Sequence, residues 1–244
     1  MGIVSSSGPL ADVVVVDFSR VLAGPFATMM LADLGARVIK VERPVTGDDS
    51  RSYGPFLEGQ SLYFARVNRG KESIVLDLHD PADLAVARGL IATADVLVEN
   101  FRPGVMERLG LGPRAVLGQQ PRLVYCSISG FGHTGPWSQL PAYDAVVQGM
   151  SGLMAITGED GGPPVKPGPP VADLSAGLYA FGAITSALLG REATGKGTHI
   201  DVAMFDATIS LLEGAALSYL ATGEEPPRMG NAHFAITPFD TFRC

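Results

Sequence analysis

Cysteine is nearly absent from this chain: Cys126 and Cys244 are the only two among 244 residues, and they lie far apart. So few cysteines at such a spacing exclude a disulfide framework and a cysteine-rich zinc site. The same scarcity is typical of proteins that fold in a reducing compartment. We therefore expect a cytoplasmic protein that holds no metal.

Positive charge is also in short supply. The chain has 18 lysines and arginines against 25 aspartates and glutamates, which gives a formal net charge of −7. An acidic protein has no general attraction for nucleic acid or for an anionic membrane surface, so we expect neither as a partner. A ligand that bears phosphate would need a local cluster of basic side chains.

Long apolar runs are missing as well. Residues 174–190 form the longest apolar stretch without a charge, but it is too short and too rich in Gly, Ala and Ser to span a bilayer. We interpret it as a buried core helix. The N-terminus lacks a secretory signal, and although it matches the Met-Gly-x-x-x-Ser myristoylation pattern, no basic cluster follows as a second membrane signal. We therefore expect no membrane association.

Several catalytic motifs are absent too. The chain has no Gly-x-Ser-x-Gly elbow, no Walker A loop and no His-Glu-x-x-His, and its four histidines are widely spaced. Gly-x-Gly-x-x-Gly occurs at residues 130–135, where it runs into Pro136 instead of a helix, so we interpret it as a loop. Without a glycine fingerprint before it, Glu42 is a weak candidate for a ribose-binding acid. A dinucleotide-dependent enzyme is therefore not favoured.

What the chain does contain is a regular alternation of strand and helix patterns. β-Branched runs predict strands at residues 13–18, 37–42, 73–78, 95–100 and 122–128 and within 195–204. Helical spacing of apolar residues predicts helices at 24–36 and 81–93, after Pro103, and later at 143–158 and 205–222. Such alternation implies right-handed crossovers. We predict an α/β fold: a Rossmann-like, mostly parallel sheet with helices on both faces.

Two segments that follow predicted strands carry polar side chains suited to a ligand. In open α/β sheets, ligands bind outside the carboxyl ends of the strands. The guanidinium groups of Arg43, Arg102 and Arg108 could hold phosphate there. Asn100 could form a hydrogen bond to the ligand, and the ring of Phe101 could stack on a base. Each alone is as readily a solvated charge or a packing residue, but together they predict a binding crevice.

One carboxylate, Asp173, stands between a proline-rich stretch and an uncharged apolar run, where a helix should begin. Its side chain could cap that helix by accepting hydrogen bonds from first-turn amides. A helix N-terminus also favours the ionised carboxylate, and an ionised carboxylate can act as a nucleophile. The residues alone leave both roles open.

Six segments, read in order, carry a family resemblance. They are DFSRVLAGPFATMMLADLGARVIKVERP, LYFARVNRGKESIVLDL, VLVENFRPGVMERLG, YCSISGFGHTGP, AYDAVVQGMSG and VADLSAG. Together they resemble the class III CoA-transferase family, also called the CaiB/BaiF family, over essentially the whole chain from Val13 onward. The resemblance implies a Rossmann-like large domain, a small domain inserted late in the chain and two interlocked subunits.

The resemblance also implies an activity and a set of site residues. Family members move CoA from an acyl-CoA to a free carboxylic acid and need neither a metal nor a redox cofactor. Their catalytic aspartate lies in the segment that matches VADLSAG, which points to Asp173. The positions where the family holds CoA are Leu22, Ala23, Arg43, Leu76, Asn100, Phe101 and Arg108, and those near the acyl group are Tyr63 and Tyr143.

Two other functions stay open. The same family includes α-methylacyl-CoA racemases, which need an acid–base pair beside the α-carbon instead of a nucleophile. Those enzymes carry histidine at the position of Tyr143, and a tyrosine with an ordinary pKa of about 10 is a poor proton acceptor near neutrality. We therefore favour the transferase. The third candidate is a non-catalytic CoA-binding module in which Asp173 is only a helix cap.

Family chains extend well beyond the last residue of this sequence, so we expect a C-terminally truncated version of the fold. We assign residues 1–204 to the N-terminal part of the large domain and residues 205–229 to a linker helix. Residues 230–244 would begin a small domain that is otherwise absent. An interlocked homodimer is expected of the full-length protein.

Overall fold

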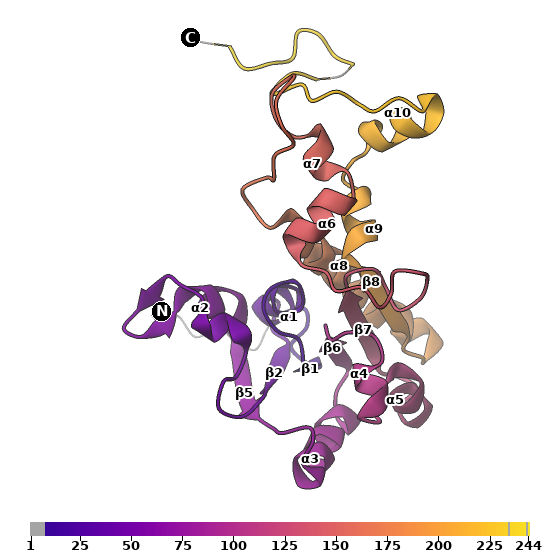
Figure 1. Ribbon diagram of the computed structural model, residues 1–244. Helices are drawn as coiled ribbons and strands as arrows, with labels where there is room; N and C mark the ends of the chain where they lie inside the picture. The colour runs from indigo at the N-terminus through magenta and orange to yellow at the C-terminus, as the bar shows by residue number, and fades with distance from the viewer. Residues whose placement is uncertain (1–7, 234, 243) are drawn as a thin grey trace.

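The computed structural model describes residues 8–233, 235–242 and 244 (Figure 1), so the N-terminal myristoylation pattern lies outside the described residues. The strands are β1 (Val14–Asp17), β2 (Arg37–Glu42), β3 (Phe56–Leu57), β4 (Gln60–Ser61), β5 (Lys71–Val75), β6 (Val96–Glu99), β7 (Val124–Ser129) and β8 (His199–Ala203). The helices are α1 (Ala23–Asp33), α2 (Leu62–Asn68), α3 (Pro81–Ala92), α4 (Val105–Arg108), α5 (Pro113–Gln119), α6 (Asp144–Met150), α7 (Leu153–Ile156), α8 (Val171–Thr194), α9 (Met204–Ile209) and α10 (Gly214–Thr222), with a 3-10 turn η1 (Asp49–Ser52).

Six strands form one parallel sheet in the order β5-β2-β1-β6-β7-β8, and β3 and β4 form a separate small ribbon. Val15 of β1, for example, lies beside Val38 of β2 on one side and beside Val96 of β6 on the other. Strands β2 and β5 lie on one side of β1, and the later strands β6, β7 and β8 lie on its other side, so the strand order reverses between β1 and β6. The predicted α/β fold is thereby confirmed, and a ligand crevice is expected at this reversal.

Helices cover both faces of the sheet, as predicted, because side chains alternate along each strand. Val15 belongs to a core formed with residues of α1 and α8, whereas its neighbour Val16 belongs to a core formed with residues of α3 and α5. Strands that are apolar on both sides must be covered on both sides, which is the usual situation in a parallel sheet. The carboxyl ends of the strands are left for polar side chains.

The longest helix, α8, packs directly on α1. Its inward face is built from small residues, and Ala172, Ala176 and Ala180 are fully buried. By length and composition alone α8 could cross a membrane, but this face is part of the domain core, as predicted for residues 174–190. The two helices approach closely at Gly177, where a Cβ atom would lie only 2.8 Å from the carbonyl oxygen of Ala23.

We expect Gly177→Ala to force α8 away from α1, because the new methyl group would overlap the Ala23 carbonyl oxygen. Overpacking of this kind costs about 1–3 kcal/mol, more than the helix-propensity gain of up to about 1 kcal/mol. The matched control is Gly182→Ala on the same helix, where a methyl group meets nothing within 4 Å and should stabilise the fold. Urea unfolding measures both changes, and equal midpoints would contradict the predicted overlap.

Helices α6, α7, α9 and α10 project beyond the sheet and form the upper part of Figure 1. The prediction of one helix over residues 143–158 is wrong, because Gly152 adopts a φ of 90° and separates α6 from α7. The predicted helix over residues 205–222 is also interrupted, and Glu213 before α10 has a φ of 43°. The segment predicted as a linker helix therefore contains two helices, while the domain boundaries themselves stay predictions.

Candidate active site

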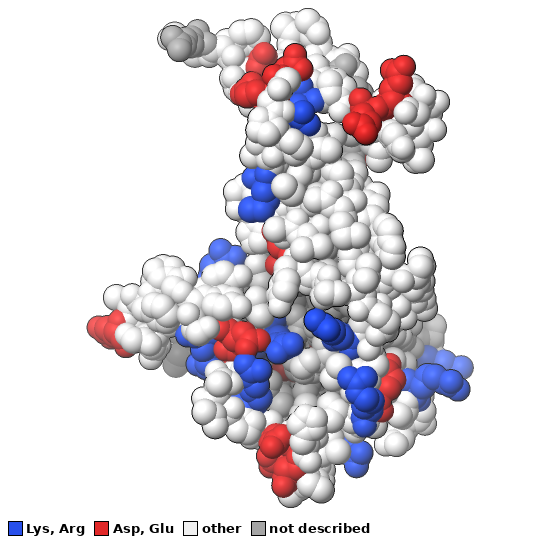
Figure 2. Space-filling model, in the orientation of Figure 1, with Lys and Arg blue, Asp and Glu red and all other residues white. Residues whose placement is uncertain are grey.

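Two cavities lie at the carboxyl ends of β1 and β6, where the strand order reverses. One has a volume of about 540 Å³ and the other of about 200 Å³. Arg20 and Phe101 line both cavities and so form the boundary between them. Figure 2 shows lysine and arginine side chains around a hollow in the lower half of the molecule. The overall charge is negative, yet this region offers the local basic cluster that a phosphate-bearing ligand requires.

The larger cavity combines apolar walls with a basic rim. Arg43 and Arg108 line it together with Leu76 and Phe101, so four predicted CoA positions meet here. Both arginines are exposed. The guanidinium of Arg43 is paired with Asp49, whereas that of Arg108 has no hydrogen bond to any residue that the structure describes. Apolar walls with cations at the edge suit a ligand that has both an aromatic base and phosphate groups.

The smaller cavity brings the predicted nucleophile together with other predicted positions. Asp173 lines it, and so do Leu22, Ala23, Asn100 and Tyr143. They come from the start of α1, the end of β6, the residue before α6 and the first turn of α8. The packing of α8 on α1 thus joins segments that are distant in the sequence.

Tyr63 is the predicted position that lines neither of these two cavities. It lies on α2, and its ring makes an edge contact with that of Tyr53, with 5.5 Å between the ring centroids. Burial raises the pKa of Tyr63, and the negative charge of Asp173 raises it further. The tyrosine is therefore close enough to Asp173 to interact with its charge, although it is not part of the cavity wall.

Arg20 was not among the predicted site residues, although it borders both cavities. Its backbone N–H donates to Oδ1 of Asn100 at 2.9 Å, and its carbonyl oxygen accepts from Nδ2 of Asn100 at 2.8 Å. Its guanidinium lies 5.8 Å from the ring centroid of Phe101 and pairs with Asp49 at 3.2 Å. Asn100 thus fixes the loop after β1 as well as facing the cavity. The sequence signal that could have identified Arg20 is its position just after the strand predicted at residues 13–18, where ligands of open sheets bind.

The loop that follows β1 is held by buried charges. Lys40 donates to the carbonyl oxygen of Ser19 at 2.8 Å and forms an ion pair of 2.8 Å with Asp48. Asp48 in turn accepts a hydrogen bond of 3.1 Å from the backbone N–H of Val21. Val21 has a φ of 68°, a left-handed conformation that β-branched residues rarely adopt. The conformation of this loop therefore depends on the buried charges beneath it.

Asp173 does not cap α8, so the cap interpretation is wrong. The N-cap residue of α8 is Pro170, and the first-turn amides of Ala172 and Asp173 donate instead to Oδ1 of Asp144, at 2.9 and 3.3 Å. Burial, and then the negative charge of Asp144, raise the pKa of Asp173 to about 7. Burial and the repulsion from Asp144 thus oppose the ionisation of Asp173, against the helix N-terminus, which favours it.

Glu42 lines the larger cavity, but its oxygens are already occupied. Arg51 donates to both of them at 2.6 and 2.7 Å, Ser73 donates at 2.6 Å and the backbone of Asp48 at 3.0 Å. Burial opposes ionisation, but these donors outweigh it and lower the pKa of Glu42 to about 2. Glu42 is therefore a structural anchor, and the weak case for a ribose-binding acid loses its support.

Two of the widely spaced histidines meet near the end of β6. The rings of His133 and His199 make an edge contact with 5.8 Å between centroids, and Nε2 of His199 lies 3.0 Å from Oγ of Ser127. Nε2 of His133 lies 3.8 Å from a carboxylate oxygen of Glu99, whose pKa burial raises to about 7. Among the described residues, no group of three or more His, Cys, Asp or Glu side chains is arranged to hold a metal ion.

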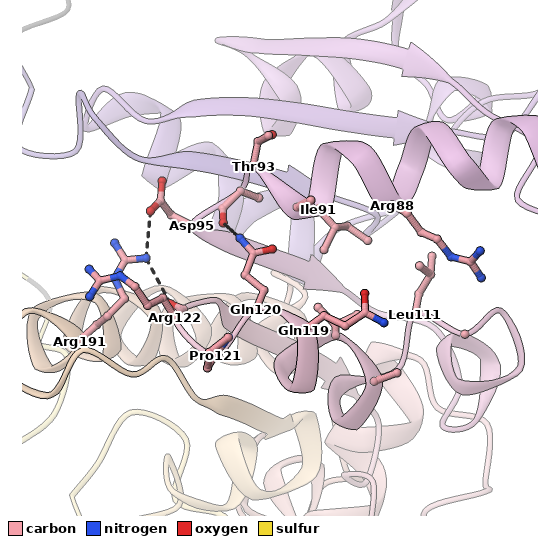
Figure 3. A pocket seen from close by; sticks show the side chains of 15 residues that line it. Arg88, Ile91, Thr93, Asp95, Leu111, Gln119, Gln120, Pro121, Arg122 and Arg191 are labelled. Carbon is pink, nitrogen blue, oxygen red and sulfur yellow. Dashed lines mark hydrogen bonds and ion pairs between the residues drawn. The ribbon is translucent and has the colours of Figure 1, made fainter.

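A third cavity, of about 650 Å³, is larger but lies near the amino ends of β6 and β7 (Figure 3). Its buried arginine, Arg191, donates to Asp95 at 2.9 Å and to the carbonyl oxygen of Arg122 at 3.4 Å (Figure 3). Ligands of open parallel sheets bind at the opposite, carboxyl ends of the strands. The two cavities at those ends are therefore the candidate active site.

Comparison with known proteins agrees with this geometry. The family model for CoA-transferase family III matches residues 10–244. The chain is 53% identical over 238 residues to acetyl-CoA:oxalate CoA-transferase of Acetobacter aceti, covering 97% of this chain and 61% of that protein. It is 48% identical over 239 residues to succinyl-CoA:glutarate CoA-transferase of Mus musculus, covering 98% of this chain and 55% of that protein.

The solved structures give the same result. The crystal structure of a CaiB/BaiF family protein from Brucella suis superposes with a TM-score of 0.90 at 46% identity, covering 97% of this chain and 64% of that one. The chain thus spans about three fifths of the length of the relatives that it matches. Because the family match extends over nearly all of its residues, the chain belongs to CoA-transferase family III.

Proposed function

We propose that the protein carrying this chain is a CoA-transferase that moves CoA from an acyl-CoA to a small carboxylic acid, with Asp173 as the nucleophile. The observation that carries the proposal is the position of Asp173 in the wall of the smaller cavity, next to a larger cavity suited to a nucleotide. Membership of the family supports the same chemistry. Because the chain covers only part of its relatives, the activity tests use the protein at its full natural length.

The first half of the reaction loads CoA onto the enzyme. A carboxylate oxygen of Asp173 attacks the thioester carbonyl carbon of the acyl-CoA, the carbon–sulfur bond breaks, and CoA leaves as a thiolate. The product is a mixed anhydride between the acyl group and Asp173. The thiolate then attacks the aspartyl carbonyl carbon of this anhydride. The donor acid leaves as a carboxylate, and an aspartyl-CoA thioester remains.

The second half transfers CoA to the acceptor. The acceptor carboxylate attacks the aspartyl carbonyl carbon, and CoA leaves again as a thiolate, which produces a second anhydride. The thiolate attacks the acceptor carbonyl carbon, so the new acyl-CoA forms and the carboxylate of Asp173 is restored. No proton or electron is gained or lost over the cycle. The protein contributes the nucleophile and the positioning of CoA.

The experiment that tests the proposal traps the loaded enzyme. The full-length protein is incubated with acetyl-CoA or succinyl-CoA and then with hydroxylamine, which converts an aspartyl anhydride or thioester to a hydroxamate. We expect mass spectrometry to find the hydroxamate at Asp173. An active enzyme in which Asp173 stays unmodified would contradict the assignment of Asp173 as the nucleophile. Exchange of the α-proton of an acyl-CoA with solvent deuterium, without an adduct, would instead support the racemase.

The basic rim of the larger cavity gives a prediction about CoA binding. Arg108→Gln should raise the KM for acyl-CoA about 10-fold with little change in kcat, because a charge-assisted hydrogen bond to phosphate contributes about 1.5 kcal/mol or more. Arg114→Gln is the matched control, since Arg114 is an exposed arginine that lines neither candidate cavity. Steady-state kinetics at two salt concentrations separate a lost phosphate contact from general screening. An equal effect of the two substitutions would contradict the assignment.

We also propose that the full-length protein is an interlocked homodimer that acts in the cytoplasm. Helix α10 has no buried residue, and Leu217 and Leu220 are 67% and 80% exposed. Apolar side chains gathered on one projecting helix are typical of surfaces that another chain or segment covers. Light scattering of the full-length protein should give twice the subunit mass. A stable monomer at micromolar concentration would contradict this part of the proposal.

A further inference from the structure

Asp144 occupies the backbone amides at the start of the helix that carries the nucleophile. It is the first residue of α6, and its Oδ1 accepts hydrogen bonds from the N–H groups of Ala172 and Asp173, at 2.9 and 3.3 Å. Its other oxygen, Oδ2, accepts a 2.6 Å hydrogen bond from Nε2 of the fully buried Gln148. Both oxygens are thus fixed, so the orientation of the Asp144 carboxylate is set by its surroundings.

The carboxylate of Asp173 has the opposite environment. It accepts no hydrogen bond from any residue within the described part of the chain, although it belongs to the first turn of α8. The amides of Ala172 and Asp173 in that turn donate to Asp144 instead. A carboxylate that lacks donors is less stabilised as an anion, and it is therefore more basic and more nucleophilic than one that caps a helix.

We propose that Asp144 is a positioning residue for CoA transfer: it takes the first-turn amides of α8 and thereby keeps the carboxylate of Asp173 unbound and available to the thioester. This inference rests on the proposed function, because it assigns Asp144 a role in preparing that nucleophile. The raised pKa of Asp173, which burial causes first and the charge of Asp144 second, agrees with it.

Asp144→Asn tests the charge of Asp144 separately, because asparagine keeps an oxygen for the two amides but removes the charge. Nδ2 of the new asparagine would face the side chain of Gln148. Oε1 of Gln148 has no hydrogen-bond partner in the described residues, so it can accept a hydrogen bond from this Nδ2 once the side-chain amide of Gln148 has flipped. We expect normal folding and an unchanged KM for acyl-CoA. Without the repulsion from Asp144, Asp173 should titrate at lower pH, so the acid limb of the kcat profile moves down and the plateau falls a few-fold.

Asp144→Ala removes the acceptor as well as the charge. The amides of Ala172 and Asp173 then lose their acceptor, and we expect the carboxylate of Asp173, which is on the same helical turn, to turn toward the helix start and away from the thioester. We expect a loss of about 100-fold in kcat, with much of it restored by asparagine at the same position. A residue that only stabilised the fold would lower the melting temperature in both variants without moving the pH profile.

A second readout does not depend on turnover. Water-soluble carbodiimides modify protonated carboxyl groups, so the pH dependence of Asp173 labelling, followed by mass spectrometry, reports its ionisation directly. The matched control is Asp206→Asn, which removes an exposed first-turn aspartate of α9 that lies outside both candidate cavities. The expected result is a labelling profile shifted to lower pH in Asp144→Asn and unshifted in the control.

The outcomes separate this inference from the proposed function. If labelling of Asp173 shifts in Asp144→Asn but the wild-type protein transfers no CoA, the proposed function fails while the influence of Asp144 on Asp173 stands. If the wild-type protein transfers CoA but neither the labelling nor the acid limb moves in Asp144→Asn, the charge of Asp144 has no part in preparing Asp173. Wild-type kcat in Asp144→Ala would overturn the positioning role itself.

Discussion

Replacing Asp173 by asparagine should abolish CoA transfer and yet make the folded protein more stable at neutral and alkaline pH. The loss of transfer follows from the proposed mechanism, in which only a carboxylate can form the anhydride and the thioester. Asparagine has nearly the same shape but no nucleophilic oxygen anion, so we expect kcat to fall by about 1,000-fold or more. Acyl-CoA should still bind, because the arginines of the larger cavity are unchanged.

The gain in stability follows from the raised pKa of Asp173, which is about 7 in the folded protein against an ordinary value of 3.8. A carboxyl whose pKa is raised by folding is ionised more readily in the unfolded chain. Its ionisation therefore destabilises the fold progressively from about pH 4 to about pH 7, and the penalty is constant above that. The full shift corresponds to about 4 kcal/mol, and we expect about 2 kcal/mol because the side chain is partly exposed.

Urea unfolding at about pH 8 and about pH 4 tests the sign of this effect. Asp173→Asn should be more stable than the wild type at the higher pH and equal to it at the lower. Asp173→Glu is the control, because it keeps a carboxyl group in the same burial and should retain the pH-dependent penalty. Equal destabilisation by Asp173→Asn at both pH values would contradict this prediction, because it would mean that the Asp173 carboxyl forms a stabilising hydrogen bond that is not seen in the structure.

The sequence predicted the sheet and many of the residues that line the two candidate cavities, because both depend on local patterns. Buried β-branched runs mark the strands, and the rule that ligands bind at strand ends pointed to Arg43, Asn100 and Phe101, which line those cavities. The resemblance to a family was needed to propose Asp173 as the nucleophile. The interruptions at Gly152 and Glu213 were missed because apolar residues continue at helical spacing through both breaks.

The electrostatics of the site could not be predicted in the same way. Asp173 was a candidate helix cap because it lies at the right place in the sequence, whereas the true acceptor, Asp144, comes from another helix. The pKa of Asp173 depends on burial and on that neighbour, and neither can be read from a linear pattern. Long-range pairs of buried charges present the same difficulty, and Asp17 is the clearest example.

Asp17→Ala should cause the largest loss of stability among the substitutions considered. The side chain is fully buried, pairs with Lys71 at 3.0 Å and accepts a 2.6 Å hydrogen bond from Thr28. Burial opposes its ionisation, but the charges of Lys71 and Lys40 and the hydroxyls of Ser19 and Thr28 lower the pKa of Asp17 to about 2. Removal of one partner of a buried ion pair costs about 3–5 kcal/mol, because the other charge is left without compensation.

The pH dependence and a double substitution identify the source of that loss. A carboxylate whose pKa is lowered by folding stabilises the protein above its ordinary pKa of 3.8, and this stabilisation disappears as the pH falls through about 2. The difference between wild type and Asp17→Ala, measured by urea unfolding, should therefore shrink in strong acid. Asp17→Leu combined with Lys71→Met replaces the pair by apolar side chains and should recover most of the stability lost in Asp17→Ala.

Because Asp17 also accepts a hydrogen bond from the backbone N–H of Ser19 at 2.9 Å, the double variant should still bind acyl-CoA more weakly than the wild type. The reason is that the loop between the two cavities is no longer held in place. Recovery of both stability and CoA affinity would show that the loop keeps its conformation without this charge.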